Sequence, residues 1–261
     1  MQSRHGSVRN SLAATRTSIR ARIRARIRAF LAARLESKTY LGLHLTIALI
    51  VVCGGVWLLS ALIDAVLDNA TLVRIDLATD AWVHARVSAA GLQFFAVISD
   101  IGSPTAMTVL AIIGGLALLI RRRPRTFVAW TAAFAGGFAI ENILKRAVHR
   151  ARPPYGTAFL NGHSFSFPSG HATGSLIGYT MLAYVLIMHW RTSRSLRTVI
   201  IAVATLIVVL VGISRVYLGV HYPSDVLGGW VTAAVWVGVC LSAVGVALHR
   251  SGRELPEHLS S

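Results

Sequence analysis

The sequence predicts an all-α membrane protein, a bundle of six transmembrane helices preceded by a basic amphipathic arm. Of the 261 residues, 54% are hydrophobic and only 14% are charged, and the mean hydropathy is +0.62. That composition is too apolar for a soluble domain and indicates that lipid is the solvent. Two further observations support this fold class. Six apolar segments are long enough to cross a bilayer, and the basic residues gather in alternate connections between them.

Residues 1–40 predict the basic amphipathic arm. Ile19, Ile23 and Ile27 fall on one helical face with Phe30 and Leu31, and arginines flank that face on both sides. Such a helix suits an anionic membrane surface, so we expect lipid headgroups as the partner of the arm. Nucleic acid is not expected, because no companion aromatic residues or binding fold accompany the arginines. A plain cytosolic tail that sets the orientation accounts for the same residues equally well.

The six apolar segments follow the arm and predict a membrane domain over residues 41–249, with a cytoplasmic tail over 250–261. Between the first and second segments lies a half-polar stretch, Asp68 to Ser103, which we expect to lie along the interface as one or two short helices. Ser103 and Pro104 predict an N-cap followed by proline at the first helical position. The expected segments are approximately Leu41–Ile63, Pro104–Ile120, Thr126–Leu144, Gly170–Met188, Arg197–Ile213 and Ser224–Leu248.

The orientation of the chain follows from where its Lys and Arg residues lie. With six crossings, nineteen of the twenty-six fall on one side, in the arm, in two connections and in the tail. The positive-inside rule makes that side cytoplasmic. We therefore expect a multi-pass protein of the cytoplasmic membrane with both termini inside the cell.

The other side receives only seven Lys and Arg residues, and five of them cluster around two short connections, Lys145–Pro168 and Ser214–Pro223. Positive charge on the translocated side runs against the general bias, so it needs a specific reason. An anionic ligand bound there supplies one, and it predicts an active site on the outer, periplasmic face.

The stretch Ser166–His171 opens the fourth apolar segment and suits an anion. Backbone N–H groups in the first turn of a helix have no intrahelical acceptor, and the helix dipole is positive there. We expect the amides of Ser169, Gly170 and His171 to hold a phosphate group.

The residues around these connections suit phosphoryl transfer. Lys145, Arg152 and Arg215 can neutralise the non-bridging phosphate oxygens, and Ser169 with Gly170 completes the cradle. His221 can attack phosphorus. Asp225 lies four residues later and can hold the far nitrogen of that ring. His171 remains as the general acid.

Two neighbours are expected to support the site. Arg150 lies within the first of the two connections. We expect it to support the phosphate site from behind the residues that contact the phosphate directly. Glu141 stands one turn before Lys145 in an apolar helix, where pairing with Lys145 is its simplest role.

Together these residues resemble the three-part signature of the type 2 phosphatidic acid phosphatase superfamily. The parts are Lys145…Arg152-Pro153, Pro168-Ser169-Gly170-His171 and Ser214-Arg215…His221…Asp225. The resemblance extends from about Asp100 to Leu248 and leaves out the arm. It implies a phosphohistidine at the position of His221, a leaving oxygen protonated by His171, a supporting place for Ser214, and no metal or other cofactor.

The expected function is that of a membrane lipid phosphatase acting on a lipid phosphate or diphosphate. The resemblance suggests undecaprenyl diphosphate, phosphatidylglycerol phosphate, phosphatidate or diacylglycerol pyrophosphate as substrates. A phosphotransferase that passes the group to another lipid or glycan would use the same site. A non-catalytic lipid-binding membrane protein is a third reading, although none of the signature residues is lost. A vanadate-dependent haloperoxidase shares the signature, but the apolar helices argue against one.

Overall fold

The computed structural model describes residues 40–156, 164–190 and 192–250. Contacts divide the chain into one unit up to Ile47 and a second unit from Ala48 onward, and the description below concerns the second. The described residues are all-helical and contain no strand. The helices are α2 (Tyr40–Asp68), α3 (Ala70–His84), α4 (Ala89–Asp100), α5 (Pro104–Ile120), α6 (Pro124–Val148), α7 (Gly170–His189), α8 (Arg194–Tyr217) and α9 (Pro223–Arg250).

Six stretches of the described chain are long and apolar enough to span a membrane, which confirms the predicted number. They are Ala48–Asp68, Ala89–Ile120, Pro124–Val148, Gly170–His189, Arg194–Tyr217 and Pro223–Ala247. The predicted basic arm and most of the tail lie outside the described residues.

The second of these stretches begins earlier than the sequence predicted, because it includes α4 as well as α5. The two helices are separated by a short break at residues 101–103. Ser103 caps α5 by accepting a hydrogen bond from the Ala106 amide at 3.1 Å, and Pro104 occupies the first turn. The predicted helix start is therefore confirmed, since proline cannot continue α4 but suits the first position of a new helix.

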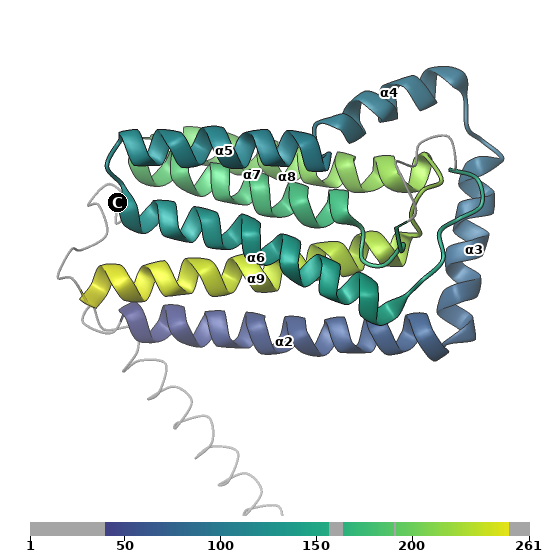
Figure 1. Ribbon diagram of the computed structural model, residues 1–261, viewed down its shortest axis with the longest axis horizontal. Coiled ribbons are helices and arrows are strands. Elements are labelled where there is room, and N and C mark those ends of the chain that lie inside the picture. The colour runs from purple at the N-terminus through teal and green to yellow at the C-terminus, as the bar shows by residue number, and fades with distance from the viewer. Residues whose placement is uncertain (1–39, 157–163, 191, 251–261) are drawn as a thin grey trace, which may run out of the picture. The chain divides into compact units, whose positions relative to one another are not determined.

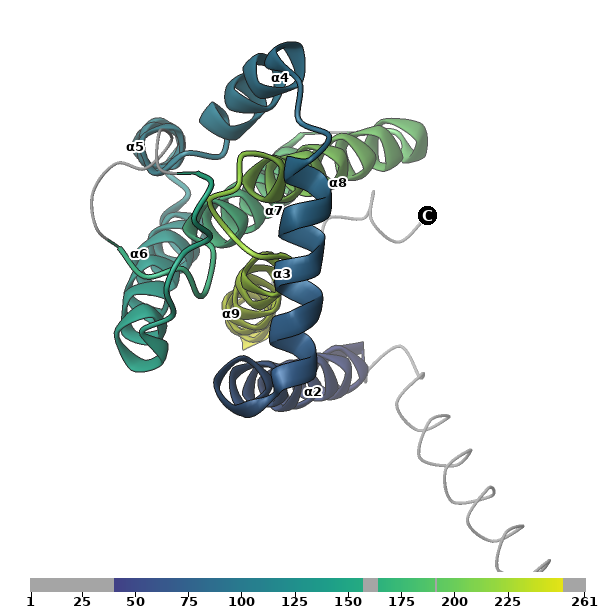
Figure 2. The same ribbon diagram turned by 90° about the vertical axis from the view of Figure 1, so that its right-hand side faces the viewer.

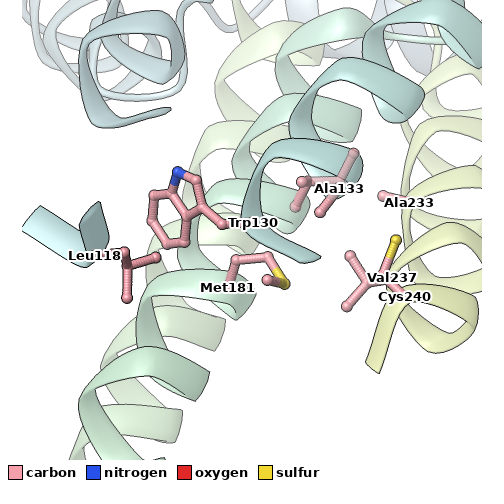
Figure 3. Close-up of a cluster of buried hydrophobic side chains, with 8 residues drawn as sticks. Leu118, Trp130, Ala133, Met181, Ala233, Val237 and Cys240 are labelled. Atoms are coloured by element: carbon pink, nitrogen blue, oxygen red, sulfur yellow. The ribbon is translucent and has the colours of Figure 1, made fainter. Parts of the chain in front are cut away.

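Helix α7 lies at the centre of the bundle and packs against α5, α6, α8 and α9. These helices run side by side in Figure 1. Helices α5, α6, α7 and α9 meet in a buried apolar cluster, as Figure 3 shows. Met181 of α7 is fully buried, and Trp130 of α6 is 1% exposed while its indole N–H donates to the Ala111 carbonyl at 2.9 Å. The remaining members are Leu118, Ala133, Ile177, Ala233, Val237 and Cys240.

The outward faces of the helices are apolar rather than polar. Trp57 is 72% exposed, Phe138 69% and Ile113 62%. In water such a surface would favour aggregation, whereas lipid chains solvate it without cost. The chain is therefore a multi-pass membrane protein.

The half-polar stretch forms two helices, α3 and α4, which agrees with the expected number. The expectation that both lie along the interface is not met for α4, because α4 is part of the second candidate span. Asn69 caps α3 by accepting from the Thr71 amide at 2.9 Å. Helix α3 crosses one end of the bundle, where it contacts α8 and α9, and Figure 2 looks at this end. The ends of α6 and α8 and the starts of α7 and α9 lie at the same end (Figure 1).

Candidate active site

Two local backbone features bring the polar connections into this end of the bundle. His149 adopts the left-handed conformation, with φ of 51°, and ends α6. Gly219 does the same after α8, with φ of +65°, where a residue without a Cβ is favoured. After this turn His221 lies against Arg152 and Ser166 of the connection that follows α6.

His221 is 2% exposed, and both ring nitrogens have polar neighbours. Nε2 lies 3.1 Å from Nη1 of Arg152, while Nδ1 lies 3.4 Å from Oγ of Ser166 and 3.6 Å from Oδ2 of Asp225. A guanidinium group can only donate, so Nε2 must carry the lone pair and Nδ1 the proton. The neutral ring therefore directs its unprotonated nitrogen toward the guanidinium group of Arg152.

Burial lowers the pKa of His221 to about 4. The hydrogen bond and the charge of Asp225 oppose this shift, and the charges of Arg152 and Arg215 add to it. The ring is consequently neutral at physiological pH, which is the form that can act as a nucleophile.

Asp225 is fully buried in the first turn of α9, and the helix start explains its position. Its Oδ2 accepts from the Tyr222 amide at 2.9 Å, the backward contact of a capping box. Ser166 donates its hydroxyl to the same oxygen at 2.5 Å. Because Oδ2 is held by both donors, the carboxylate stays beside Nδ1 of His221.

Arg150 occupies the other oxygen of Asp225. Its Nη1 donates to Oδ1 of Asp225 at 2.6 Å and to Ser224 at 2.7 Å, and its Nη2 donates to Oδ2 of Asp76 at 2.7 Å. Burial lowers the pKa of Arg150, but the Asp225 and Asp76 carboxylates outweigh burial and raise it overall. Arg150 thus bridges two carboxylates, and its place behind the direct phosphate ligands stays a prediction.

Arg152 is fixed by several acceptors besides His221. Its Nε donates to the Ser164 carbonyl at 2.8 Å, Nη1 to the Val220 carbonyl at 2.9 Å and Nη2 to the Ser164 hydroxyl at 2.7 Å. Burial lowers the pKa of Arg152, and the charges of Asp225 and Glu141 oppose the shift. A guanidinium group remains charged even so, and here it is held rigidly beside Nε2 of His221.

The other two predicted cations come from the ends of α6 and α8. Lys145 pairs with Glu141 at 2.8 Å, which is the pairing that the sequence suggested. Arg215 is 6% exposed and donates through Nη1 to Ser99, while its buried Nε has no partner among the described residues. A buried donor without a partner is costly, and an anion bound at the site would satisfy it.

The start of α7 differs in one respect from the expectation. The Ser169 amide donates to the Asp225 carbonyl at 3.0 Å, so the prediction that this amide faces a phosphate is wrong. The Gly170 and His171 amides remain as first-turn donors. The hydroxyl of Ser169 is fully buried without a partner in the described part of the chain, and it is free to serve as the ligand instead.

His171, the predicted general acid, lies within electrostatic range of Arg215, His221, Lys145 and Arg152. The structure therefore brings the predicted cations and both histidines to one place. Ser214 is different. It is fully buried and donates its hydroxyl to the Val211 carbonyl of its own helix at 2.6 Å, and its supporting role at the site stays a prediction.

A model of the PAP2 superfamily matches residues 126–247. Phosphatidylglycerophosphatase B of Bacillus subtilis (strain 168) is 34% identical over 133 residues, which cover 51% of this chain and 65% of that protein. Decaprenylphosphoryl-5-phosphoribose phosphatase of Mycobacterium tuberculosis (strain ATCC 25618 / H37Rv) is 36% identical over 149 residues, which cover 55% of this chain and 73% of that protein. The chain belongs to the PAP2 superfamily.

The fold of this PAP2 protein is also that of a solved relative. The crystal structure of a transmembrane PAP2 type phosphatidylglycerolphosphate phosphatase from Bacillus subtilis superposes with a TM-score of 0.68 at 26% sequence identity. The superposition covers 74% of this chain and 94% of that one, so it extends well beyond the residues that carry the signature.

Several polar side chains of the PAP2 site were missed by sequence reasoning. Asp76 and Ser99 come from α3 and α4, outside the region that matches the superfamily, and each holds one site arginine. Ser166 and Ser224 flank Asp225 in space. A signal existed only for Ser166, which stands two residues before the signature residue Pro168, and for Ser224, which stands next to Asp225.

Proposed function

We propose that this PAP2 protein is a membrane lipid phosphatase that works through a phosphohistidine on Nε2 of His221. The observation that carries the proposal is the arrangement of that ring. Its Nε2 accepts from Arg152 at 3.1 Å, and its Nδ1 faces Asp225 at 3.6 Å. A buried, neutral imidazole with its lone pair beside a rigid guanidinium is suited to attack a phosphorus atom whose oxygens that guanidinium binds.

In the first step, Nε2 of His221 forms a bond to phosphorus and the bond from phosphorus to the lipid oxygen breaks. His171 gives its proton to that oxygen. Lys145, Arg152 and Arg215 stabilise the charge on the equatorial oxygens, and Asp225 stabilises the imidazolium. In the second step, His171 takes a proton from water, the water oxygen bonds to phosphorus, and the bond to Nε2 breaks.

The substrate is a lipid phosphomonoester or diphosphate whose chains stay in the bilayer. Phosphatidylglycerol phosphate, undecaprenyl diphosphate, phosphatidate and diacylglycerol pyrophosphate are the candidates. The first is supported by the similarity to a phosphatidylglycerophosphatase B, and a prenyl-linked substrate by the similarity to a decaprenylphosphoryl-5-phosphoribose phosphatase. The apolar faces around the site suit lateral entry from lipid.

The placement of the site is part of the proposal. The excess of Lys and Arg in alternate connections supports cytoplasmic termini and a site on the outer face of the cytoplasmic membrane. Residues 41–249 then form the membrane phosphatase domain, residues 1–40 bind anionic headgroups on the inner surface, and residues 250–261 are a cytoplasmic tail.

A substrate panel on the purified protein tests this function. Phosphatidylglycerol phosphate, phosphatidate and undecaprenyl diphosphate are offered in detergent with a chelator present, and both phosphate and lipid products are followed with a labelled phosphoryl group. We expect phosphate release from one of them and none from the His221→Ala protein. Release that persists in His221→Ala, or that requires a divalent metal, contradicts the mechanism. Label that appears in a second lipid rather than in free phosphate identifies a phosphotransferase.

A further inference from the structure

Asp76 is a buried carboxylate that lies outside the superfamily-matched region and yet reaches the candidate active site. It is 1% exposed on α3, and both of its oxygens are used. Oδ2 accepts from Arg150 at 2.7 Å and from the Ser224 hydroxyl at 2.5 Å, and Oδ1 accepts from the Ser224 amide at 3.2 Å. A buried charge persists only when it is paired and hydrogen-bonded in this way.

The guanidinium group of Arg150 links Asp76 to Asp225, so the place of Asp76 determines how Arg150 is oriented toward Asp225. The group is planar and rigid, so fixing Nη2 on Asp76 fixes the direction in which Nη1 points. That nitrogen donates to Oδ1 of Asp225 at 2.6 Å. The guanidinium also lies over the ring of Tyr222, 4.4 Å from its centroid, which holds the plane from one side. Asp225 in turn lies against Nδ1 of His221.

We propose that Asp76 is a positioning residue for the nucleophile, and that it acts through Arg150 and Asp225 on the orientation of the His221 ring. The inference rests on the proposed function of His221. Two carboxylates share one guanidinium, so Arg150 cannot neutralise Asp225 completely. Asp225 therefore keeps the negative charge that stabilises the imidazolium formed during attack.

Removing the charge of Asp76 changes this balance. In an Asp76→Asn protein, Arg150 loses one of its two carboxylates and pairs with Asp225 alone. The Asp225 carboxylate is then neutralised more fully and drawn toward Arg150, away from Nδ1 of His221. A misplacement of about 1 Å costs roughly 10²-fold in rate, so we expect a loss of about that size in phosphohistidine formation.

Rapid-quench measurement of the phosphoenzyme separates positioning from stability. With labelled lipid substrate, the rate constant of label transfer to the protein reports the nucleophile, and the burst amplitude reports the folded fraction. We expect Asp76→Asn to lower the rate constant. Asp80→Asn is the matched control, because Asp80 is also buried, one turn later on α3. It is expected to leave the rate constant within about twofold of the unmutated protein.

A double-mutant cycle then tests the route of the effect. If Asp76 acts through Asp225, adding Asp76→Asn to Asp225→Asn lowers the rate constant by no more than about twofold further. Multiplicative losses, or a normal rate constant with a reduced amplitude in Asp76→Asn, overturn the proposal. If Asp76→Asn does not fold, Ser224→Ala is measured instead, since its hydroxyl contacts both Asp76 and Arg150. A normal rate constant in that protein also overturns the proposal.

The two proposals fail in different ways. Label that still transfers in His221→Ala contradicts the phosphohistidine itself. If no label is transferred in His221→Ala but the rate constant of label transfer is normal in Asp76→Asn, only the proposed role of Asp76 is contradicted.

Discussion

Nη1 of Arg152 lies 3.1 Å from Nε2 of His221 and 2.9 Å from the carbonyl of Val220, the residue that precedes this histidine. One guanidinium nitrogen therefore contacts both the ring of the proposed nucleophile and the backbone carbonyl of the residue before it. The rest of the guanidinium is held by Ser164. Arg152 thus has a fixed place relative to the phosphorus that Nε2 attacks, and a simple positive charge in the same region would not reproduce it.

Replacing Arg152 by lysine keeps the charge but removes the fork of donors. One ammonium group cannot contact Ser164, Val220 and the transferring phosphoryl group together. Loss of a preorganised donor at the transition state costs roughly 10²- to 10³-fold, so we expect a fall of that order in kcat/KM for Arg152→Lys. Steady-state kinetics in detergent measure it. Arg146→Lys, at an exposed position in the last turn of α6, serves as control, and full activity in Arg152→Lys would show that charge alone suffices.

The acid limb of the pH–rate profile depends on the protonation of His221. Its pKa is lowered by burial to about 4, so the ring stays neutral well below the ordinary value of 6.5. Acidification removes the nucleophile only when the pH falls through about 4, and kcat/KM is expected to decline there.

The measurement is kcat/KM against pH, with the ring followed separately by NMR of nitrogen-15-labelled histidine. The signal assigned by its loss in His221→Ala should titrate near pH 4. An inflection near 6 in kinetics alone belongs to the substrate phosphate, whose second pKa lies at about that value. Titration of the His221 signal itself near 6.5 contradicts the expectation.

Gly170 allows Glu141 to lie directly against the start of α7. A Cβ added at Gly170 would overlap Oε1 of Glu141, so Gly170→Ala displaces the carboxylate that is paired with Lys145. Because Lys145 then loses its position, we expect kcat/KM to fall by roughly 10- to 100-fold. Gly174→Ala is the matched control one turn later, where the nearest atom is Cγ of flexible Met107 at 3.3 Å. Equal activity in the two variants would show that displacing the Glu141 carboxylate does not move Lys145 away from its working position.

The core contact of α7 depends on Met181, which is fully buried between helices. Met181→Ala leaves a cavity, and the free energy of unfolding is expected to fall by about 2–5 kcal/mol. Ile113→Ala is the control, because Ile113 is 62% exposed on α5 and its methyl groups face lipid. We expect that change to cost less than about 0.5 kcal/mol. Denaturant unfolding in mixed micelles compares the two variants, and equal losses would place Met181 outside the core.

Much of this architecture can be predicted from short stretches of the sequence. The number of membrane spans and the orientation are each predicted from many residues together, so a misjudged single position does not change either prediction. The signature residues His171, Arg152 and His221 were recognisable for another reason: they stand at fixed spacing beside Pro and Gly, where helices must begin or end. The start of α5 at Ser103 followed from the same local chemistry and was confirmed.

The partners of the site residues were not predictable in this way. Asp76 meets Arg150 across 74 residues of sequence, and Ser99 meets Arg215 across 116. No spacing rule links such pairs, because they depend on how α3 and α4 fold over the end of the bundle. The Ser169 amide was misjudged for the same reason, since its acceptor is the Asp225 carbonyl of a different helix.

The long separation of Asp76 from its partners also bears on how the protein is made. Asp76 leaves the ribosome long before Arg150, and Ser224 follows only with the last membrane helix. Until α9 has been made, the carboxylate has no complete set of donors. A chain interrupted before residue 224 would therefore contain Asp76 without the amide and hydroxyl of Ser224, two of the donors on which its burial depends.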